Sequence, residues 1–195
     1  MSKDQCLISI NGFNSTIENL SSFISITKAE DFISNKVLDI EIAKSENAQR
    51  INLTLNSSST DLIDFEINLT VNEGAILEFV DESNYSNNSN IRLITQLHKN
   101  SCFELYKLNS YNNENTNKFY HSCSLLENST FKDYSFSNGS KENSSKTIIN
   151  LDDVNSRYLG SGVSINNSTN SDLSLIHISE PTRRYAISYA VFCLK

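Results

Sequence analysis

The sequence has little of several residue types that commonly accompany catalysis or membrane insertion. Its 195 residues include one proline, five scattered glycines and no tryptophan. No apolar run reaches the length of about 18 residues that a membrane-spanning helix needs, so no such span is predicted. The glycines form no phosphate-binding loop. The four cysteines form no CxxC pair or other metal-binding spacing, which predicts reduced, unpaired thiols.

Positive charge is also scarce and scattered. The formal net charge is −7, from 16 Lys and Arg against 23 Asp and Glu. Because phosphate recognition needs a clustered basic face, we expect no nucleic-acid partner. The opening residues, "MSKDQCLISINGF", lack a basic segment followed by an apolar stretch and a small-residue cleavage site. We therefore expect no secretory signal and a cytoplasmic protein.

What the chain does contain is asparagine in excess and an internal repeat. All 27 asparagines lie between Asn11 and Asn170. Five segments align, "ENAQRINL", "EGAILEFV", "KNSCFELY", "ENSTFKDY" and "VNSRYLGS". Their second positions, separated by 27, 26, 28 and 27 residues, are Asn47, Gly74, Asn100, Asn128 and Asn155. Since Gly and Asn most readily adopt a left-handed backbone, each of these positions is predicted to be a sharp corner between strands.

The residues around each corner alternate as strands do. The position after the corner is always small: Ala48, Ala75, Ser101, Ser129 and Ser156. Seven, five and three residues before the corner, one face is predicted to point inward: Ile40, Ile42, Lys44; Ile67, Leu69, Val71; Leu93, Thr95, Leu97; His121, Cys123, Leu125; Ile148, Asn150, Asp152. A period of two predicts a half-buried strand. The alternation resumes after the corner, as in Ile51, Leu53 and Leu55 or Leu77 and Phe79.

A repeat of this size cannot bury its own apolar face and must stack on its neighbours. We therefore predict an all-β fold, a right-handed parallel β-helix with coils of about 27 residues. The segments "ESNYSNNSN", "NSYNNENTNK" and "SNGSKENSSK" occur at matching places between coils. They are predicted to be solvated polar loops on one side of the solenoid.

The block from Ile67 to Asp172 resembles the core of the SufB/SufD family of the sulfur-mobilisation pathway. The likeness is carried by "VNEGAILEFVDE", "HKNSCFELYKLN", "SFSNGSKENSSKTIINLDD" and "SRYLGSGV". The opening "ISINGFNSTIENL" is similar to the first strand of SufD-type members. No stretch resembles the tyrosine- and tryptophan-containing core segment of SufB, which favours the SufD type.

The resemblance implies a non-catalytic subunit of a scaffold complex with SufB and the ATPase SufC, on which sulfide and iron are combined. The fragment itself would then bind no cofactor or metal, and the complex would handle the iron–sulfur cluster. The family's histidine near the end of the β-helix and its C-terminal helices match no position here. This organisation implies an N-terminal strand and polar lead-in over residues 1–35 and a β-helix core over residues 36–172, truncated at its C-terminal end.

Residues 173–195 do not continue the likeness. Their first part, "LSLIHISEPTR", and later part, "ISYAVFCL", resemble the translation of a transposase-type sequencing adapter and of its constant stretch beyond the sample index. The segment, which includes His177, Pro181 and Cys193, is therefore predicted to be non-native. We expect it to attach loosely and to depart from the coil repeat, although "YAISYAVFCL" is apolar enough to extend a sheet.

The chemically capable residues of the native stretch suggest no catalytic, cofactor or metal site. His121 and Cys123 occupy inward positions and are predicted to be packed in the core. His98, before a corner, is predicted to be solvated. Cys102 is predicted to face outward, without a neighbour that lowers its pKa. The pairs Asp81/Glu82 and Asp152/Asp153 cannot converge, because adjacent strand residues point to opposite faces.

These observations favour an interaction protein over an enzyme. The first hypothesis is the SufD-like assembly subunit. The alternatives are a secreted β-helix carbohydrate-active enzyme, such as a lyase, and a surface adhesin solenoid. An enzyme of that kind would need a cleft lined by acidic and basic residues from successive coils, and both alternatives would need a secretory signal. The fold alone does not separate the three classes.

Overall fold

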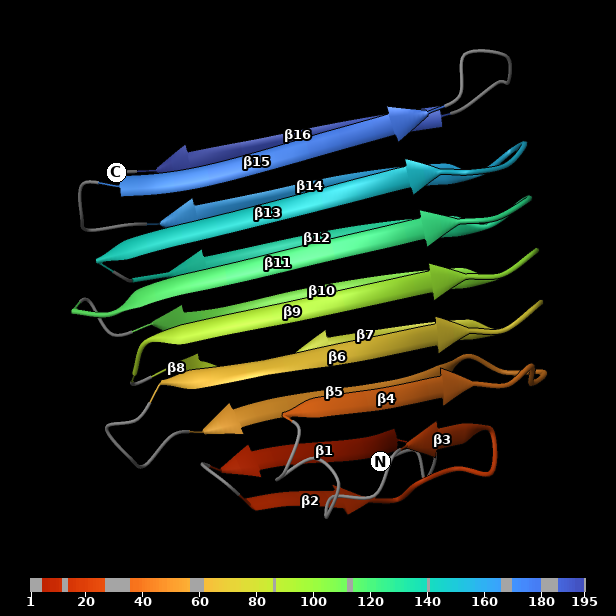
Figure 1. Cartoon of the computed structure of the whole chain (residues 1–195), viewed down its shortest axis with the longest axis horizontal. Helices are drawn as coiled ribbons and strands as arrows, with labels where there is room; N and C mark the ends of the chain where they lie inside the picture. The colour runs from red at the N-terminus through yellow and green to blue at the C-terminus, as the bar shows by residue number, and fades with distance from the viewer. Residues whose placement is uncertain are drawn as a thin grey trace.

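The computed structural model describes residues 5–11, 14–26, 36–56, 62–85, 87–111, 114–139, 141–165, 170–179 and 186–194, the last two stretches as backbone only. These residues form two β-sheets that lie one behind the other (Figure 1). The seven-stranded sheet contains β3 (Ile24–Ile26), β4 (Val37–Ile42), β6 (Ile63–Val71), β9 (Ser89–Leu97), β11 (Thr116–Leu125), β13 (Glu142–Leu151) and β15 (Asn170–Ser179).

The nine-stranded sheet contains the remaining strands, which from β4 onward follow each strand of the first sheet along the chain. They are β1 (Gln5–Asn11), β2 (Asn14–Glu18), β5 (Gln49–Asn56), β7 (Ile76–Asp81), β8 (Asn84–Tyr85), β10 (Cys102–Tyr111), β12 (Thr130–Asn138), β14 (Arg157–Ile165) and β16 (Ala186–Leu194). From β4 onward, neighbouring strands within each sheet pair in parallel.

The chain winds as a solenoid. Each strand of the seven-stranded sheet turns through a corner into a strand of the nine-stranded sheet and then advances to the next coil. In Figure 1 the front strands run to the right, the rear strands run to the left and the chain rises, which makes the winding right-handed. We call the pair β4–β5 the first coil, and the pairs β6–β7, β9–β10, β11–β12 and β13–β14 the second to fifth coils. The predicted right-handed parallel β-helix is confirmed.

The core lies between the two sheets, where inward side chains of successive coils stack. Ile51, Leu53 and Leu55 on β5 and Leu77 and Phe79 on β7 are all buried, as the alternation predicts. An aromatic column continues across the nine-stranded sheet from Phe103 through Phe131 to Tyr158, with ring centroids 5.1 and 5.3 Å apart. In-register parallel pairing brings equivalent residues of neighbouring coils within packing distance.

Four of the five predicted corners have the predicted backbone. Gly74, Asn100, Asn128 and Asn155 have φ between 55° and 68°. This conformation directs the peptide N–H along the solenoid axis, so that Asn100 N donates to Glu127 O of the next coil at 3.0 Å. The following serines are buried, and each hydroxyl donates to a carbonyl three residues earlier, as Ser129 Oγ does to Leu126 O at 2.6 Å. The left-handed residue and the small residue that follows it therefore together form one hydrogen-bonded corner.

The first corner differs, and the prediction for Asn47 is wrong. Asn47 is not among the described residues with positive φ. Six residues, 43–48, connect β4 to β5, whereas four residues, 72–75, connect β6 to β7. The longer connection needs no left-handed residue, and it leaves Lys44 and Ala48 exposed, so Lys44 does not point inward as predicted.

The predicted inward face of the fifth coil is also wrong. Ile148, Asn150 and Asp152 were predicted to point inward, yet the buried residues of β13 are Asn143, Thr147, Ile149 and Leu151. The cause is one extra corner residue: four residues separate Leu125 from β12, whereas five separate Leu151 from β14. Because a shift of one residue exchanges the two faces of a strand, counting back from Asn155 gives the opposite face.

The Asn- and Ser-rich segments between coils are mostly strand, not loop. Residues 89–90, 109–111, 116–118, 137–138 and 142–146 extend β9 to β13. Their side chains bond across coils: Ser89 Oγ donates to Asn117 Oδ1 at 2.8 Å, and Asn90 Nδ2 donates to Asp64 Oδ1 at 2.9 Å. Stacking of polar residues in register supplies partners that a single strand lacks, which offsets their low strand propensity.

The segment predicted to be non-native extends both sheets. β15 pairs in register with β13, from Glu142 opposite Asn170 to Leu151 opposite Ser179, and β16 pairs likewise with β14. The expectation that the segment departs from the coil repeat is therefore wrong for its backbone. Backbone pairing requires alternation and length but no particular side chains, so the origin of residues 173–195 stays a prediction. The side chains of His177 and Cys193, and Pro181 as a whole, lie outside the described residues.

Candidate functional site

The most unusual feature of the core is a group of polar residues in the third and fourth coils. His121 on β11 is fully buried, and its Nε2 lies 3.0 Å from Thr95 Oγ1 on β9. Its ring forms a T-shaped contact with the ring of Phe131, with centroids 5.1 Å apart and an angle of 85° between the ring planes. Burial, assisted by the charge of Lys107, lowers the pKa of His121 well below its ordinary value. The imidazole is therefore neutral at physiological pH and packed, as its inward position predicts.

A buried ion pair lies on the opposite sheet. Lys107 of β10 and Asp133 of β12 are 6% and 7% exposed. Lys107 Nζ is 3.2 Å from Asp133 Oδ1 and 3.3 Å from Oδ2, and it sits 4.6 Å from the centre of the Phe119 ring. Two charges removed from water are tolerated only when they pair closely, and here the carboxylate and the ring together surround the ammonium.

The thiols are not activated. Cys123, two residues after His121 on the same inward face, is fully buried, and burial raises its pKa well above the ordinary value. A neutral thiol beside a neutral imidazole lacks the thiolate that a nucleophilic cysteine needs. Burial also raises the pKa of Cys6 to about 11. Cys102 occupies an outward position on β10 as predicted, but it is only partly exposed and burial raises its pKa as well.

The other candidate residues behave mostly as predicted. Asp81 is buried and accepts a hydrogen bond from Ser83 Oγ, whereas Glu82 is exposed, so the two carboxylates diverge. Asp152 and Asp153 lie in the fifth corner. His98 is partly exposed, so it is less solvated than predicted. Among the residues that the structure describes, no three His, Cys, Asp or Glu side chains gather as metal ligands.

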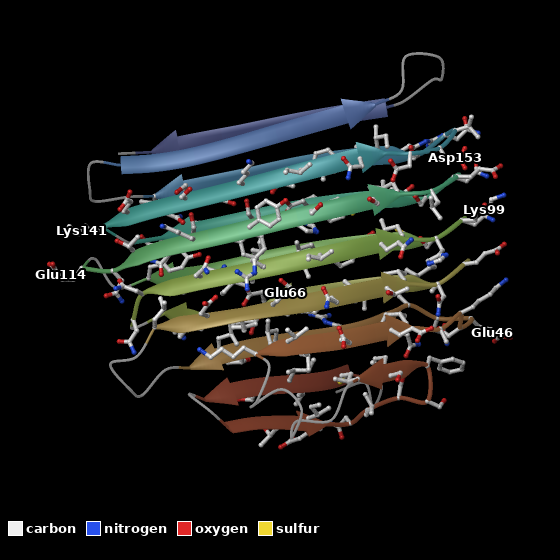
Figure 2. The ribbon with its side chains drawn as sticks, in the orientation of Figure 1. Glu46, Glu66, Lys99, Glu114, Lys141 and Asp153 are labelled. Atoms are coloured by element: carbon white, nitrogen blue, oxygen red, sulfur yellow. The ribbon has the colours of Figure 1, made fainter. Side chains whose placement is uncertain are left out.

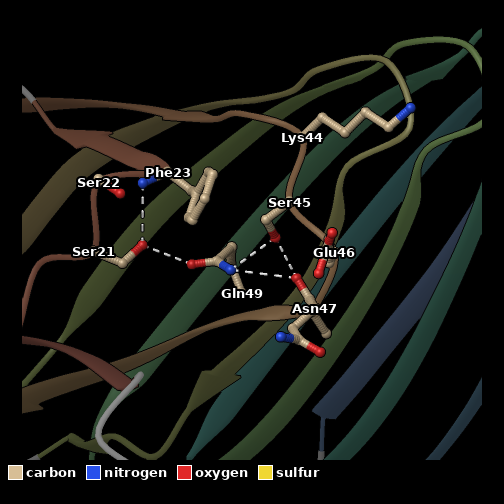
Figure 3. A pocket seen from close by; sticks show the side chains of 9 residues that line it. Ser21, Ser22, Phe23, Lys44, Ser45, Glu46, Asn47 and Gln49 are labelled. Atoms are coloured by element: carbon tan, nitrogen blue, oxygen red, sulfur yellow. Dashed lines mark hydrogen bonds between the residues drawn. The ribbon is translucent and has the colours of Figure 1, made fainter.

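A pocket of about 660 Å³ lies beside the irregular first corner (Figure 3). Residues 21–23 form one wall and residues 44–49 form the other. Gln49 is buried at the base, where its Oε1 accepts from Ser21 Oγ at 2.6 Å and its Nε2 donates to Ser45 Oγ at 2.9 Å. Through these bonds the Gln49 side-chain amide holds residues 21–23 and 44–49 together. The later coils use a left-handed corner residue instead.

Charged side chains lie along both edges of the solenoid and on the outer faces of its sheets. Figure 2 shows Glu46, Lys99 and Asp153 along the corner edge, and Glu114 and Lys141 along the opposite edge. Ion pairs connect successive coils, as Lys99 Nζ does with Glu127 Oε2 at 2.5 Å. Acidic and basic groups therefore neutralise one another between coils, and the described residues do not converge on a charged cleft of the kind that a β-helix lyase needs.

The outer side of the nine-stranded sheet is the main feature that the sequence analysis missed. Leu108, Tyr134, Phe136 and Leu159 are 48%, 38%, 40% and 40% exposed. They stand on β10, β12 and β14. Leu108, Tyr134 and Phe136 line a shallow pocket of about 280 Å³ together with Tyr106 and Val163. The signal was present in "FELYKLNSYN", where both alternating sets contain apolar or aromatic residues, but the analysis followed the inward set alone.

Comparison with known proteins does not identify this chain. No protein-family model matches the sequence, and no curated protein matches it. The described part of the chain contains no helix long and apolar enough to cross a membrane. The resemblance to the SufB/SufD core therefore stays a prediction that rests on the quoted segments.

Proposed function

We propose that this chain is a SufD-like, non-catalytic subunit of a cytoplasmic scaffold that assembles iron–sulfur clusters together with SufB-like and SufC-like proteins. In this role the β-helix holds binding surfaces in place and performs no bond-forming chemistry. The iron–sulfur cluster is the cargo of the complex.

One observation carries the proposal. The segments that resemble the SufB/SufD core occupy equivalent places in successive coils. "VNEGAILEFVDE" covers the end of β6, the corner at Gly74 and β7, whereas "HKNSCFELYKLN" covers the corner at Asn100 and β10. β7 and β10 pair in register, with Leu77 opposite Phe103. The likeness thus follows the coil repeat itself, as expected for a shared β-helical core.

The chemistry of the described residues is compatible with this role. His121 and Cys123 are buried and neutral, and Lys107 is paired with Asp133. These four side chains are thus used inside the core, whereas the outer side of the nine-stranded sheet offers apolar surface for binding.

Co-purification tests the proposal. The tagged full chain, co-expressed with the SufB-like and SufC-like proteins, should retain the SufB-like protein on an affinity column, and the SufC-like protein through it, because the family's C-terminal helices match no position in this chain. The variants Cys102→Ser and His98→Gln should retain them equally, because the proposal assigns these residues no chemistry. Retention of neither partner by a folded chain would contradict the proposal, and specific binding to a polysaccharide would favour the carbohydrate-active alternative.

A further inference from the structure

Six side chains form an ordered patch on the outer side of the nine-stranded sheet, which we call the aromatic face. They are Glu104, Tyr106 and Leu108 on β10 and Lys132, Tyr134 and Phe136 on β12. The strands pair in register, with Glu104 opposite Lys132, Tyr106 opposite Tyr134 and Leu108 opposite Phe136. Alternate residues of both strands, such as Phe103 and Phe131, are buried in the core, so all six point outward.

The aromatic face is ordered by its own contacts. Lys132 Nζ lies 2.6 Å from Glu104 Oε1, and Tyr106 Oη donates to Glu104 Oε2 at 2.6 Å. The rings of Tyr106 and Tyr134 stack with centroids 5.1 Å apart. A surface whose side chains already have one arrangement loses less conformational entropy on binding than a flexible one.

Its size is suited to a weak interface. With Leu159 and Val163 of β14, the patch crosses three neighbouring strands. At strand spacings of about 4.8 Å and alternate residues about 6.8 Å apart, such a face covers roughly 300 Å². This is as large as the largest patch of a typical monomer, and two such faces together fall below the roughly 1,200 Å² of a standard stable interface.

We propose that the aromatic face binds a second copy of this chain face to face, about a two-fold axis that runs parallel to the strands between β10 and β12. Such an axis exchanges β10 with β12 and keeps each residue's position along the strand. Glu104 then faces Lys132 of the partner subunit, Tyr106 faces Tyr134 of the partner subunit, and Leu108 faces Phe136 of the partner subunit.

Charge complementarity selects a second copy as the occupant. Two acidic and two basic groups alternate around the axis, because each Glu104 meets a lysine of its own chain and a lysine of the other. No two like charges of the aromatic face lie opposite each other across the axis. The neighbouring Glu78, which is in register with Glu104, faces the apolar Leu159 of the partner subunit. A face that matches itself in charge, ring and apolar position is what an isologous interface requires.

Sedimentation velocity of the full chain at low and high protein concentration tests this inference. We expect a reversible monomer–dimer equilibrium. The variant Phe136→Ser should weaken dimerisation at least tenfold by removing the apolar contact between Phe136 and Leu108 of the partner subunit. Its matched control is Ile94→Ser, because Ile94 is equally exposed, at 42%, on β9 of the other sheet.

Exchanging the charges of Glu104 and Lys132 tests whether the partner is a second copy of this chain. Lys132→Glu places four carboxylates around the axis and should abolish dimerisation, whereas the double variant Glu104→Lys/Lys132→Glu restores the alternation and should restore dimerisation. The same exchange of Glu66 and Arg92, an outward ion pair at 3.0 Å on the other sheet, should leave the dimer unchanged. Circular dichroism confirms that each variant is folded.

Three results would overturn the inference. The first is sedimentation of the folded wild-type chain as a monomer at every concentration, which would leave the face to a different partner. The second is unchanged association of Phe136→Ser and Lys132→Glu, which would place the interface elsewhere on the molecule. The third is failure of the double charge exchange to restore a dimer that the single variant loses. The inference does not depend on the proposed function, since it is tested without SufB-like or SufC-like proteins.

Discussion

The first and fourth coils follow the same order of strand, corner and strand, but their interior side chains differ. Apart from Gln49 at the start of β5, the interior of β4 and β5 is aliphatic, with Leu38, Ile40, Ile42, Ile51, Leu53 and Leu55 buried. The interior of β11 and β12 includes His121, Cys123, Phe131 and Asp133. The polar groups of the fourth coil find partners in the third: Thr95 and His121, like Lys107 and Asp133, are 26 residues apart. The comparison teaches that a solenoid accepts polar interior residues where the neighbouring coil supplies the partner.

The largest expected effect concerns the aromatic column of the fourth coil. Phe131 contacts the rings of Phe103, Tyr158 and His121. Phe131→Ala should lower the free energy of unfolding by about 4 kcal/mol, since rigid stacked neighbours cannot close the cavity. Chemical denaturation measures this change. Leu53→Ala in the first coil, where flexible aliphatic neighbours can close in, should cost about 3 kcal/mol. A larger loss for Leu53→Ala would contradict the comparison.

The buried ion pair gives the next effect. Asp133→Leu leaves the Lys107 ammonium without its carboxylate and should cost about 3 kcal/mol. The double variant Lys107→Met/Asp133→Leu removes both charges and should lie within about 1 kcal/mol of the wild type, because well-packed apolar residues can replace a buried pair. Denaturant titration of all three chains checks this. A double variant as unstable as the single one would show that the pair stabilises the fold in its own right.

The buried histidine should make stability depend on pH. The pKa of His121 is lowered in the folded chain, so its stabilising effect is complete above the unfolded value of about 6.5 and is lost as pH falls below it. The unfolded chain then binds a proton that the folded chain excludes, at a cost of about 1.4 kcal/mol per pH unit. Between pH 6.5 and about 5, His121→Leu should flatten the curve by roughly 2 kcal/mol, measured by denaturation at each pH.

The matched control for this titration is His98→Gln, in which a partly exposed histidine before the third corner is removed. Its stability curve should keep the wild-type slope over the same pH range. An equal slope in the wild type and in His121→Leu would show that His121 does not carry the pH dependence.

The smallest effect separates the two kinds of corner. Asn128 has φ of 55°, so Asn128→Ala should cost about 1 kcal/mol, and Asn128→Gly should recover most of that loss. Asn47→Ala should change the unfolding free energy by less than about 0.5 kcal/mol, since the first corner has no left-handed residue at this position. Thermal denaturation distinguishes the two, and equal losses would contradict the assignment of the corners.

Much of the fold was predictable because the repeat is local. The spacing of Gly74, Asn100 and Asn128 predicted corners that the structure confirms, and the alternation around them predicted the buried faces of β5 to β11. The errors at Asn47 and in the fifth coil have different causes. Two extra residues in the first corner remove the need for a left-handed residue without changing the buried face of β4. One extra residue before Asn155 exchanges the predicted faces of β13. The residues that lie opposite each other on neighbouring strands are set by the pairing between coils.

The sequence by itself determined the all-β class, the coil length and four of the five predicted left-handed corners, because these follow from the alternation and backbone preferences of short segments. Tertiary structure alone decided that Lys107 meets Asp133, that Asn- and Ser-rich segments become strand, and that Glu104 to Phe136 form one outer face. The physical reason is stacking: these contacts join residues about one coil apart, and their partners are set by the register between strands that a linear pattern does not specify.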